Sequence, residues 1–220
     1  TEWYRADVLL IQNEDNSGQT LARQLGGLGS LVSLAGISAG SADSTEALAV
    51  LKSRDFARSF IKDRGLLPVL LHDEWDEEAE AWKAKNSEDQ PDIRDAVEYF
   101  DESIRSVTRD TRTQLVTLSI RWTDPELAAE WATDLVARLN ETMRSRALRD
   151  AERNVAYLEE QLTQTNIATL RDSIGNLLET ELQKLMLAKG NDEFAYRVVD
   201  PAEVPKLRDW PRRSLIVVIA

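Results

Sequence analysis

Three stretches of the chain carry the spacing of apolar residues that is typical of β-strands. In residues 3–11 and 115–122, apolar and polar side chains alternate, so each stretch would bury one face and expose the other. Residues 194–199 form a third predicted strand, which we expect to return to the same small mixed sheet. The remaining sequence has mostly helical spacing, so the predicted fold class is α+β, with helices packed on the sheet.

Capping residues and apolar spacing predict helices in the first half of the chain. Ser44 or Thr45 would cap a helix that ends just before Gly65. The apolar residues 66–71 predict a short strand or linker. Asp92 would begin a further helix, whose buried side chains are Ile93, Val97, Phe100 and Ile104.

The segment between these helices is strongly acidic. Residues 72–103 hold 13 acidic and 3 basic residues, which account for 10 of the 12 net negative charges. Trp75 and Trp82, seven residues apart, predict one helix with an aromatic stripe. Paired carboxylates also serve in glycoside hydrolysis and in calcium sites, but the spacing here matches no EF-hand loop. The pattern therefore favours a solvated acidic face.

The longest helical pattern runs from Asp124 to Lys189. Asp124 suits the cap, Pro125 suits the first helical position, and apolar residues then recur every three or four positions. A straight helix of this length would extend about 100 Å, and residues 190–199 could span only about 33 Å of the way back to the sheet. Because the polar residues 163–166 interrupt the apolar stripe, we expect a long projecting helical hairpin with its turn within residues 163–169.

Such a hairpin would leave part of its apolar stripe without a partner in its own chain, because the descending arm is the shorter one. Burial against neighbouring copies is the simplest solution, so we expect a homo-oligomer. A self-sufficient α+β monomer is the alternative. The candidate contact residues on the stripe are Leu135, Leu139, Met143, Val155, Leu158 and Leu162.

A glycine-rich apolar stretch provides a second candidate contact. Residues 26–40 hold five of the nine glycines, interleaved with large aliphatic side chains. Neither G-x-x-x-x-G-K-[ST] nor G-x-G-x-x-G occurs here, which excludes a phosphate-binding loop of these types. We interpret the stretch as an apolar loop that meets a partner chain, with Leu28, Leu31 and Leu34 as the candidate residues.

Composition narrows the chemistry that the chain can perform. Its 220 residues, 42% apolar and 30% charged, suffice for a buried core. With no cysteine and His72 as the single histidine, the usual zinc sites, disulfides and cysteine nucleophiles are excluded. A net charge of −12 disfavours nucleic acid as a partner. We expect no catalytic residues, no metal and no cofactor.

Aromatic and basic residues gather near both ends of the chain. The candidate membrane-interface residues are Trp3, Tyr4, Trp210, Arg212 and Arg213. They are followed by the apolar run Leu215–Ala220, which is shorter than the about 20 residues that cross a bilayer. We expect this run to start a membrane helix, and a final buried strand is the alternative. The expected domains are a base (1–122 and 191–209), the hairpin (123–190) and the start of a second transmembrane helix (210–220).

Several sequence stretches, in this order and spacing, are those of one known family. They are LKSRDF at 51–56, DPELAAEW at 124–131, LNE at 139–141, YLEEQL at 157–162, MLA at 186–188, VVDPA at 198–202, and the segment from Pro205 to Pro211-Arg212-Arg213. Over nearly its whole length the chain resembles the Wzz-type polysaccharide co-polymerases, the chain-length determinant proteins of bacterial surface polysaccharide.

The resemblance implies the periplasmic domain of a bacterial inner-membrane protein, held by flanking helices, with an α/β base near the membrane. It implies ring-like homo-oligomers that set the modal chain length of O-antigen or a related glycan in lipopolysaccharide biosynthesis, without catalysis of their own. The implied partner is a Wzy-type polymerase, and contact with the growing polysaccharide stays open. A periplasmic adaptor of an export system, which also carries a helical hairpin, and a carboxylate-based glycan hydrolase are the alternatives.

Overall fold

The computed structural model describes residues 2–13 and 39–210 of the chain. They belong to two compact units. The base unit comprises Thr1–Ile11, Leu48–Leu135 and Val198–Ala220, and the hairpin unit comprises Gln12–Ala47 and Val136–Arg197. Helices and a small sheet both occur, so the predicted α+β fold class is confirmed.

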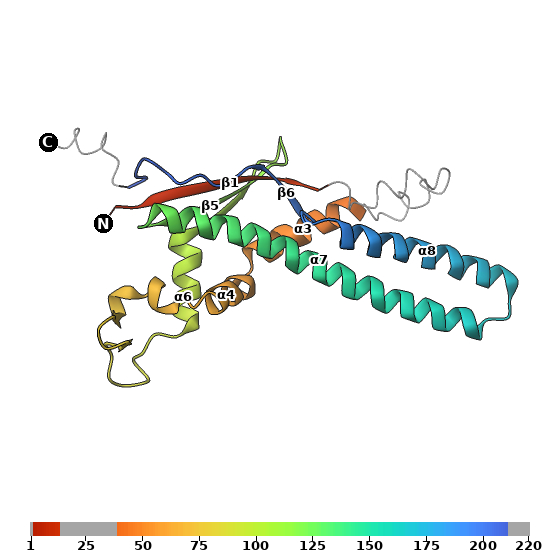
Figure 1. The fold of residues 1–220 in the computed structure, drawn as a ribbon, viewed down its shortest axis with the longest axis horizontal. Helices are drawn as coiled ribbons and strands as arrows, with labels where there is room; N and C mark the ends of the chain where they lie inside the picture. The colour runs from red at the N-terminus through yellow and green to blue at the C-terminus, as the bar shows by residue number, and fades with distance from the viewer. Residues whose placement is uncertain (1, 14–38, 211–220) are drawn as a thin grey trace. The chain divides into compact units, whose positions relative to one another are not determined.

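A four-stranded sheet in the order β4-β5-β1-β6 contains all three predicted strands (Figure 1). The alternating stretches correspond to β1 (Tyr4–Gln12), β5 (Val116–Trp122) and β6 (Tyr196–Asp200). β5 pairs antiparallel with β1 on one side and with β4 on the other. The two pairings among β4, β5 and β1 are therefore antiparallel, whereas the expected mixed sheet implies at least one parallel pair.

Alternation in the sequence predicts no strand at β4 (Arg105–Arg109), because Val107 is its one aliphatic residue. The turn that joins it to β5 is organised by Asp110. Its Oδ1 atom accepts hydrogen bonds from the backbone N–H groups of Arg112 (2.7 Å) and Thr113 (3.1 Å). This edge strand forms because the turn and the neighbouring strand hold it, whereas its own hydrophobic pattern is weak.

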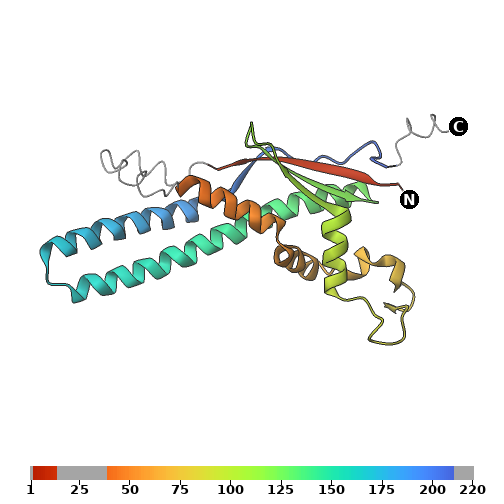
Figure 2. The same ribbon diagram turned by 180° about the vertical axis from the view of Figure 1, so that it is seen from behind.

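The sheet buries one face, as the alternation predicts. Ala6, Val8 and Leu10 of β1 lie opposite Ile120, Leu118 and Val116 of β5, and each of these side chains is at most 1% exposed. Figures 1 and 2 show helices α4, α6 and the first turns of α7 on one side of the sheet. Aromatic rings fill this core, with Trp131 of α7 packed 5.1 Å from Trp122 between ring centroids.

Two helices form where the sequence predicts one. α3 spans Ala39–Lys52 and α4 spans Arg54–Asp63. Ser53 separates them and caps α4, because its hydroxyl accepts a hydrogen bond from the backbone N–H of Phe56 (3.2 Å). The expected cap at Ser44 or Thr45 is wrong, since the helix has already begun at Ala39. Gly65, with φ of +63°, ends the pair as predicted.

Two predictions for residues 66–82 are wrong. In place of a strand or linker, Leu67–Leu70 form the short helix α5, which Pro68 can begin because it needs no backbone N–H there. In place of a helix, β2 (Trp75–Asp76) and β3 (Ala81–Trp82) form an antiparallel hairpin. Trp75 and Trp82 are paired across this hairpin, with ring centroids 4.9 Å apart. Because their separation of seven residues also suits a helix, the sequence alone does not indicate this contact.

The helix predicted to begin at Asp92 is present as α6 (Ile93–Tyr99). The Asp92 side chain accepts a hydrogen bond from the backbone N–H of Arg94 (2.6 Å), and the Asp95 side chain accepts one from the backbone N–H of Asp92 (2.7 Å). Together these bonds form a capping box. The chain continues as one π-helical turn, Phe100–Ile104, directly into β4.

The predicted hairpin and the position of its turn are confirmed. α7 (Pro125–Gln164) and α8 (Ala168–Gly190) are separated by three residues within the expected 163–169 segment. Asp124 caps α7 as expected, because its Oδ1 atom accepts hydrogen bonds from the backbone N–H groups of Glu126 (2.8 Å) and Leu127 (3.1 Å). In both ribbon views α8 runs back beside the second part of α7 (Figures 1 and 2).

Candidate functional site

The first half of the predicted contact stripe lies in the interior of the chain. Leu135 and Leu139 are fully buried, and Met143 is 7% exposed. Their neighbours on α7 with the same helical spacing, such as Trp131, are buried as well. The chain already covers this part of the stripe, so these three residues offer little surface to a second copy, and their contact with one stays a prediction.

The second half of the stripe remains partly accessible. Val155, Leu158 and Leu162 are half-buried along α7. Nearby, the Asn154 amide donates a hydrogen bond to the Glu181 carboxylate of α8 (3.2 Å), which ties the two arms together at their surface. These three leucine and valine side chains stay candidates for contact with another chain. Leu28, Leu31 and Leu34, the other candidates, lie outside the described residues.

More large apolar side chains are exposed on the hairpin than we expect if α7 and α8 bury their apolar stripes against each other. Of the positions that continue the stripe onto α8, Ile174 is buried, but Leu170, Leu177 and Leu182 are 46%, 56% and 42% exposed. We call the exposed apolar set of the hairpin those large apolar side chains that are at least 42% exposed: Tyr157, Ile167, Leu170, Leu177, Leu182, Met186 and Leu187. A concentration of this kind marks an interaction surface.

The exposed apolar side chains of α8 flank its buried face on both sides. Ile174 marks the face turned inward. At about 3.6 residues per turn, Leu182 and Met186 lie along one edge of that face and Leu177 lies along the other, whereas Leu170 is in line with the buried Ala188, five turns further along the helix. A helix with two apolar edges can bury both of them only against elements on both sides. Sequence spacing places these residues correctly but cannot tell which of them α7 leaves uncovered.

The return from α8 to the sheet is fixed by two asparagines. Asn140 of α7 is 4% exposed, and its Oδ1 atom accepts hydrogen bonds from the backbone N–H groups of Ala195 and Tyr196, each at 2.9 Å. Its Nδ2 atom donates to the carbonyl oxygen of Tyr196 (2.8 Å). Asn13 donates through its side chain to the carbonyl oxygen of Glu193 (2.7 Å). These bonds position the two ends of the hairpin unit that lead into the sheet.

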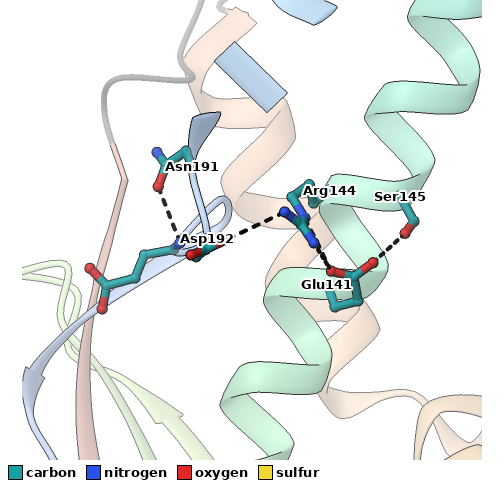
Figure 3. A network of polar contacts seen from close by, with 6 residues as sticks. Glu141, Arg144, Ser145, Asn191 and Asp192 are labelled. Atoms are coloured by element: carbon teal, nitrogen blue, oxygen red, sulfur yellow. Dashed lines mark hydrogen bonds and ion pairs between the residues drawn. The ribbon is translucent and has the colours of Figure 1, made fainter. Parts of the chain in front are cut away.

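A charged network surrounds this return segment (Figure 3). Arg144 of α7 pairs with Glu141 and, at 3.3 Å between Nη1 and Oδ1, with Asp192. The Glu141 carboxylate also accepts a hydrogen bond from the Ser145 hydroxyl (2.7 Å). That bond, together with the one from Arg144, lowers the pKa of Glu141 below its ordinary value. The network lies at the surface, so it orders the segment with a modest contribution to stability.

The two chain ends meet in the base unit. The backbone N–H of Trp3 donates to the carbonyl oxygen of Trp210 (3.0 Å), and the backbone N–H of Asp209 donates to the carbonyl oxygen of Trp3 (2.7 Å). The Tyr4 hydroxyl donates to the Glu2 carboxylate (3.0 Å), a bond that raises the pKa of Tyr4. Three predicted membrane-interface residues, Trp3, Tyr4 and Trp210, are thus brought together, whereas Arg212 and Arg213 lie outside the described residues.

Arg105 holds the backbone at the break between α3 and α4, which lies within residues 51–56. Its side chain is 4% exposed and pairs with Asp101 (2.6 Å), and burial lowers the pKa of its guanidinium group. The same guanidinium donates to the carbonyl oxygens of Leu51 (2.6 Å), Lys52 (3.3 Å) and Ser53 (3.4 Å). Arg105 therefore provides hydrogen bonds to the carbonyl groups of Leu51 and Lys52 at the break between α3 and α4, and a further one to Ser53, whose carbonyl also accepts from the backbone N–H of Ala57. Sequence analysis does not single out this residue.

Within residues 2–13 and 39–210, no group of three or more histidine or carboxylate side chains is arranged to hold a metal ion. In the same residues, no helix is both long enough and apolar enough to cross a membrane. The acidic segment contributes local structure instead, as the capping box at Asp92 shows.

No protein-family model matches this chain, and no curated protein matches it. Solved structures to which it is similar include a fragment of WzzB, a polysaccharide co-polymerase from Salmonella Typhimurium, with 18% identity and a TM-score of 0.40 over 96% of this chain and 100% of the other. A full-length bacterial polysaccharide co-polymerase has 13% identity and a TM-score of 0.35 over 99% of this chain and 80% of its own.

A third similar structure is a mutant of the lipopolysaccharide O-antigen chain-length regulator WzzB from Shigella flexneri. It has 13% identity and a TM-score of 0.30 over 94% of this chain and 100% of its own. All three structures come from the family that the sequence of this chain resembles.

Proposed function

We propose that this protein regulates the modal chain length of a bacterial surface polysaccharide, O-antigen or a related glycan, as an oligomeric scaffold in the inner membrane. The described domain stands in the periplasm and acts with a Wzy-type polymerase. The sequence stretches from residue 51 to residue 213, in their order and spacing, support the family, and the exposed apolar set of the hairpin supports the oligomer.

The oligomer follows from the two apolar edges of α8. Leu182 and Met186 on one edge, and Leu177 on the other, are 42% to 64% exposed in a single chain. A twofold dimer would cover one edge and leave the other in water, whereas a closed ring covers both by joining one edge to the opposite edge of the next copy. Ring closure is therefore the assembly that best buries this surface.

The membrane attachment follows from the paired chain ends. Trp3 and Trp210 are joined by backbone hydrogen bonds, so the described part of the base unit begins and ends at one place. The aromatic side chains there, with Arg212 and Arg213 beyond them in the sequence, have the composition of a membrane interface. On this basis the domain division is a base beside the bilayer, a hairpin at 123–190 and the start of a second membrane helix at 210–220.

In this proposal the protein catalyses no reaction. The ring organises copies of the polymerase and biases the moment at which the growing glycan is released. The surface of the hairpin and the apolar loop around Leu28, Leu31 and Leu34 are the candidate contacts with the polymerase. The scaffold thus acts by holding a fixed number of binding surfaces at a fixed spacing, and this requires no catalytic side chain.

The test is complementation of a strain that lacks its own chain-length regulator. The full-length protein is expressed there, and the surface polysaccharide is separated by length on a gel. A band pattern clustered around one modal length supports the proposal. A broad distribution identical to that of the empty strain, obtained while the protein is present in the membrane, would contradict it.

The same strain separates the two alternatives. An adaptor of an export system would change the amount of exported material but leave its length distribution unaltered. A glycan hydrolase would shorten chains progressively with time and would do so with purified polysaccharide. The length distribution and its time course therefore distinguish the three functions.

A further inference from the structure

Three large apolar side chains stand exposed in the last described segment of the base unit. Val204 is 51% exposed, Leu207 is 85% exposed and Trp210 is 57% exposed. Scattered exposed apolar residues are ordinary, but three of this size within residues 204–210 form a patch. We call these three residues the terminal patch. Leu207 is the most exposed large apolar residue among those that the structure describes.

The end of the terminal patch at Trp210 is anchored to the first strand of the base unit. The carbonyl oxygen of Trp3 accepts hydrogen bonds from the backbone N–H groups of Asp209 (2.7 Å) and Trp210 (3.3 Å). Arg208 forms an ion pair with Glu2. Trp3 is itself fixed, because its ring meets the edge of Trp122 with centroids 6.2 Å apart. Trp210 is thus exposed on an anchored backbone, and Leu207 lies two residues before the anchored Asp209.

The residues around the patch have the chemistry of the lipid headgroup region. Trp210 has an apolar ring with one N–H donor, and Tyr4, whose hydroxyl donates to the Glu2 carboxylate that pairs with Arg208, also combines a ring with a polar group. Lys206, between Val204 and Leu207, can keep its ammonium group in water while its aliphatic stem lies along lipid. Tryptophan, tyrosine and lysine are the residues that accumulate at this depth of a bilayer.

The length of the following chain places the patch beside the bilayer. The apolar run Leu215–Ala220 begins five residues after Trp210. Five residues span at most about 18 Å when fully extended. If the apolar run enters the hydrocarbon core, Trp210 therefore lies within reach of the headgroup layer, which is about 5–8 Å thick on each side of the core.

We infer that the terminal patch, Val204, Leu207 and Trp210, inserts into the headgroup region of the bilayer and fixes the base unit against the membrane surface. The inference rests on the proposed membrane attachment and adds a second contact to it. A flanking helix alone leaves a domain free to tilt, whereas an inserted apolar patch beside that helix restricts the tilt.

The test is the depth of a label at position 207. Because the chain has no cysteine, Leu207→Cys carries a single environment-sensitive fluorophore. The labelled full-length protein is reconstituted into vesicles of phosphatidylethanolamine and phosphatidylglycerol that contain lipids spin-labelled either near the headgroup or deep in the acyl chain. Glu179→Cys at an exposed position of α8, and Val69→Cys in α5, which replaces a side chain 39% exposed, are the matched controls.

We expect the label at 207 to lose emission with the shallow quencher, to lose less with the deep quencher, and to emit at shorter wavelength than the controls. Equal and weak quenching at positions 207, 179 and 69 would overturn the inference. A shift to shorter wavelength without quenching by either lipid would also overturn it, because the patch would then be covered by protein. Either result would contradict membrane insertion of the terminal patch without changing the expected glycan length distribution. The inference and the proposed function can therefore fail independently.

Discussion

Asn140 pairs with the backbone of Tyr196 in both directions, accepting from its N–H group (2.9 Å) and donating to its carbonyl oxygen (2.8 Å). Both residues are buried, at 4% and 2% exposed. The side-chain amide therefore holds the first residue of β6 as a neighbouring strand would. This contact determines where the chain leaves the hairpin, so the geometry of the hairpin base depends on one side chain.

Replacing this amide should be costly. We expect Asn140→Ala to lower the free energy of unfolding by about 2–3 kcal/mol, because buried backbone groups lose their partners. Asn154→Ala removes the exposed bond to Glu181 and should change stability by less than about 0.5 kcal/mol. Denaturant unfolding of the two variants beside the unaltered protein measures this difference. Equal effects of the two substitutions would show that the contact at Tyr196 does not hold the segment.

The buried guanidinium of Arg105 should matter more than exposed arginines. We expect Arg105→Ala to lower stability by about 3–5 kcal/mol, since Asp101 and the carbonyl groups of Leu51 and Lys52 lose the guanidinium that binds them. Arg105→Lys should recover only part of this, because an ammonium group cannot reproduce the planar fork. Arg58→Ala, which breaks an exposed pair with Asp55, is the control and should have a small effect. Thermal unfolding of the three variants would decide.

The Trp75–Trp82 contact predicts a measurable coupling. In a double-mutant cycle of Trp75→Ala and Trp82→Ala, the two rings should show an interaction free energy of about 0.5–1.5 kcal/mol. The physical reason is that each ring loses its partner across the hairpin when the other is removed. Strictly additive effects would mean that the rings do not pack on each other, as they would not on a helix.

Acid should destabilise the protein through carboxylates that bind hydrogen-bond donors in the folded state. The backbone N–H groups of Thr113 and Arg112 lower the pKa of Asp110 below 3.8, and the Arg94 side chain lowers the pKa of Asp92. A lowered folded-state pKa contributes stability above the unfolded-state value, and that contribution is lost as pH falls through the folded-state value.

The measurement is the free energy of unfolding between about pH 6 and about pH 2, where these carboxylates take up protons. Asp110→Asn keeps an oxygen acceptor for the turn but cannot titrate, so its stability should fall less steeply with decreasing pH than that of the unaltered protein. Parallel curves for the two proteins would show that Asp110 does not contribute to the acid dependence.

The strands β1 and β5 could be predicted because each alternates apolar and polar side chains within its own sequence. β4 could not, since Val107 alone gives no period and the strand depends on its turn and its partner. The separation of seven residues between Trp75 and Trp82 suits the helical stripe predicted from the sequence, but it suits this hairpin equally well. Such elements are decided by contacts between segments, which local sequence does not contain.

The candidate contact surface of the hairpin could be predicted only in part, because burial also depends on contacts between segments. Leu139 and Leu182 have similar positions in the apolar stripe, yet Leu139 is buried and Leu182 is 42% exposed. The difference depends on which segments pack against each part of the hairpin. The hairpin, by contrast, could be predicted from chain length, because the strand at 194–199 has to reach the sheet, and the polar residues 163–166 located its turn.

The central claim is that assembly through the edges of α8 sets glycan length. It is tested most directly by the polysaccharide length distribution of cells that carry the Leu182→Asp, Met186→Asp double variant, with Glu179→Lys, which changes charge at an exposed position of α8, as the control. We predict that the unaltered protein and the control give one modal length, and that the double variant, folded and present in the membrane, gives the broad distribution of the empty strain. An unchanged modal length in the double variant would contradict the account.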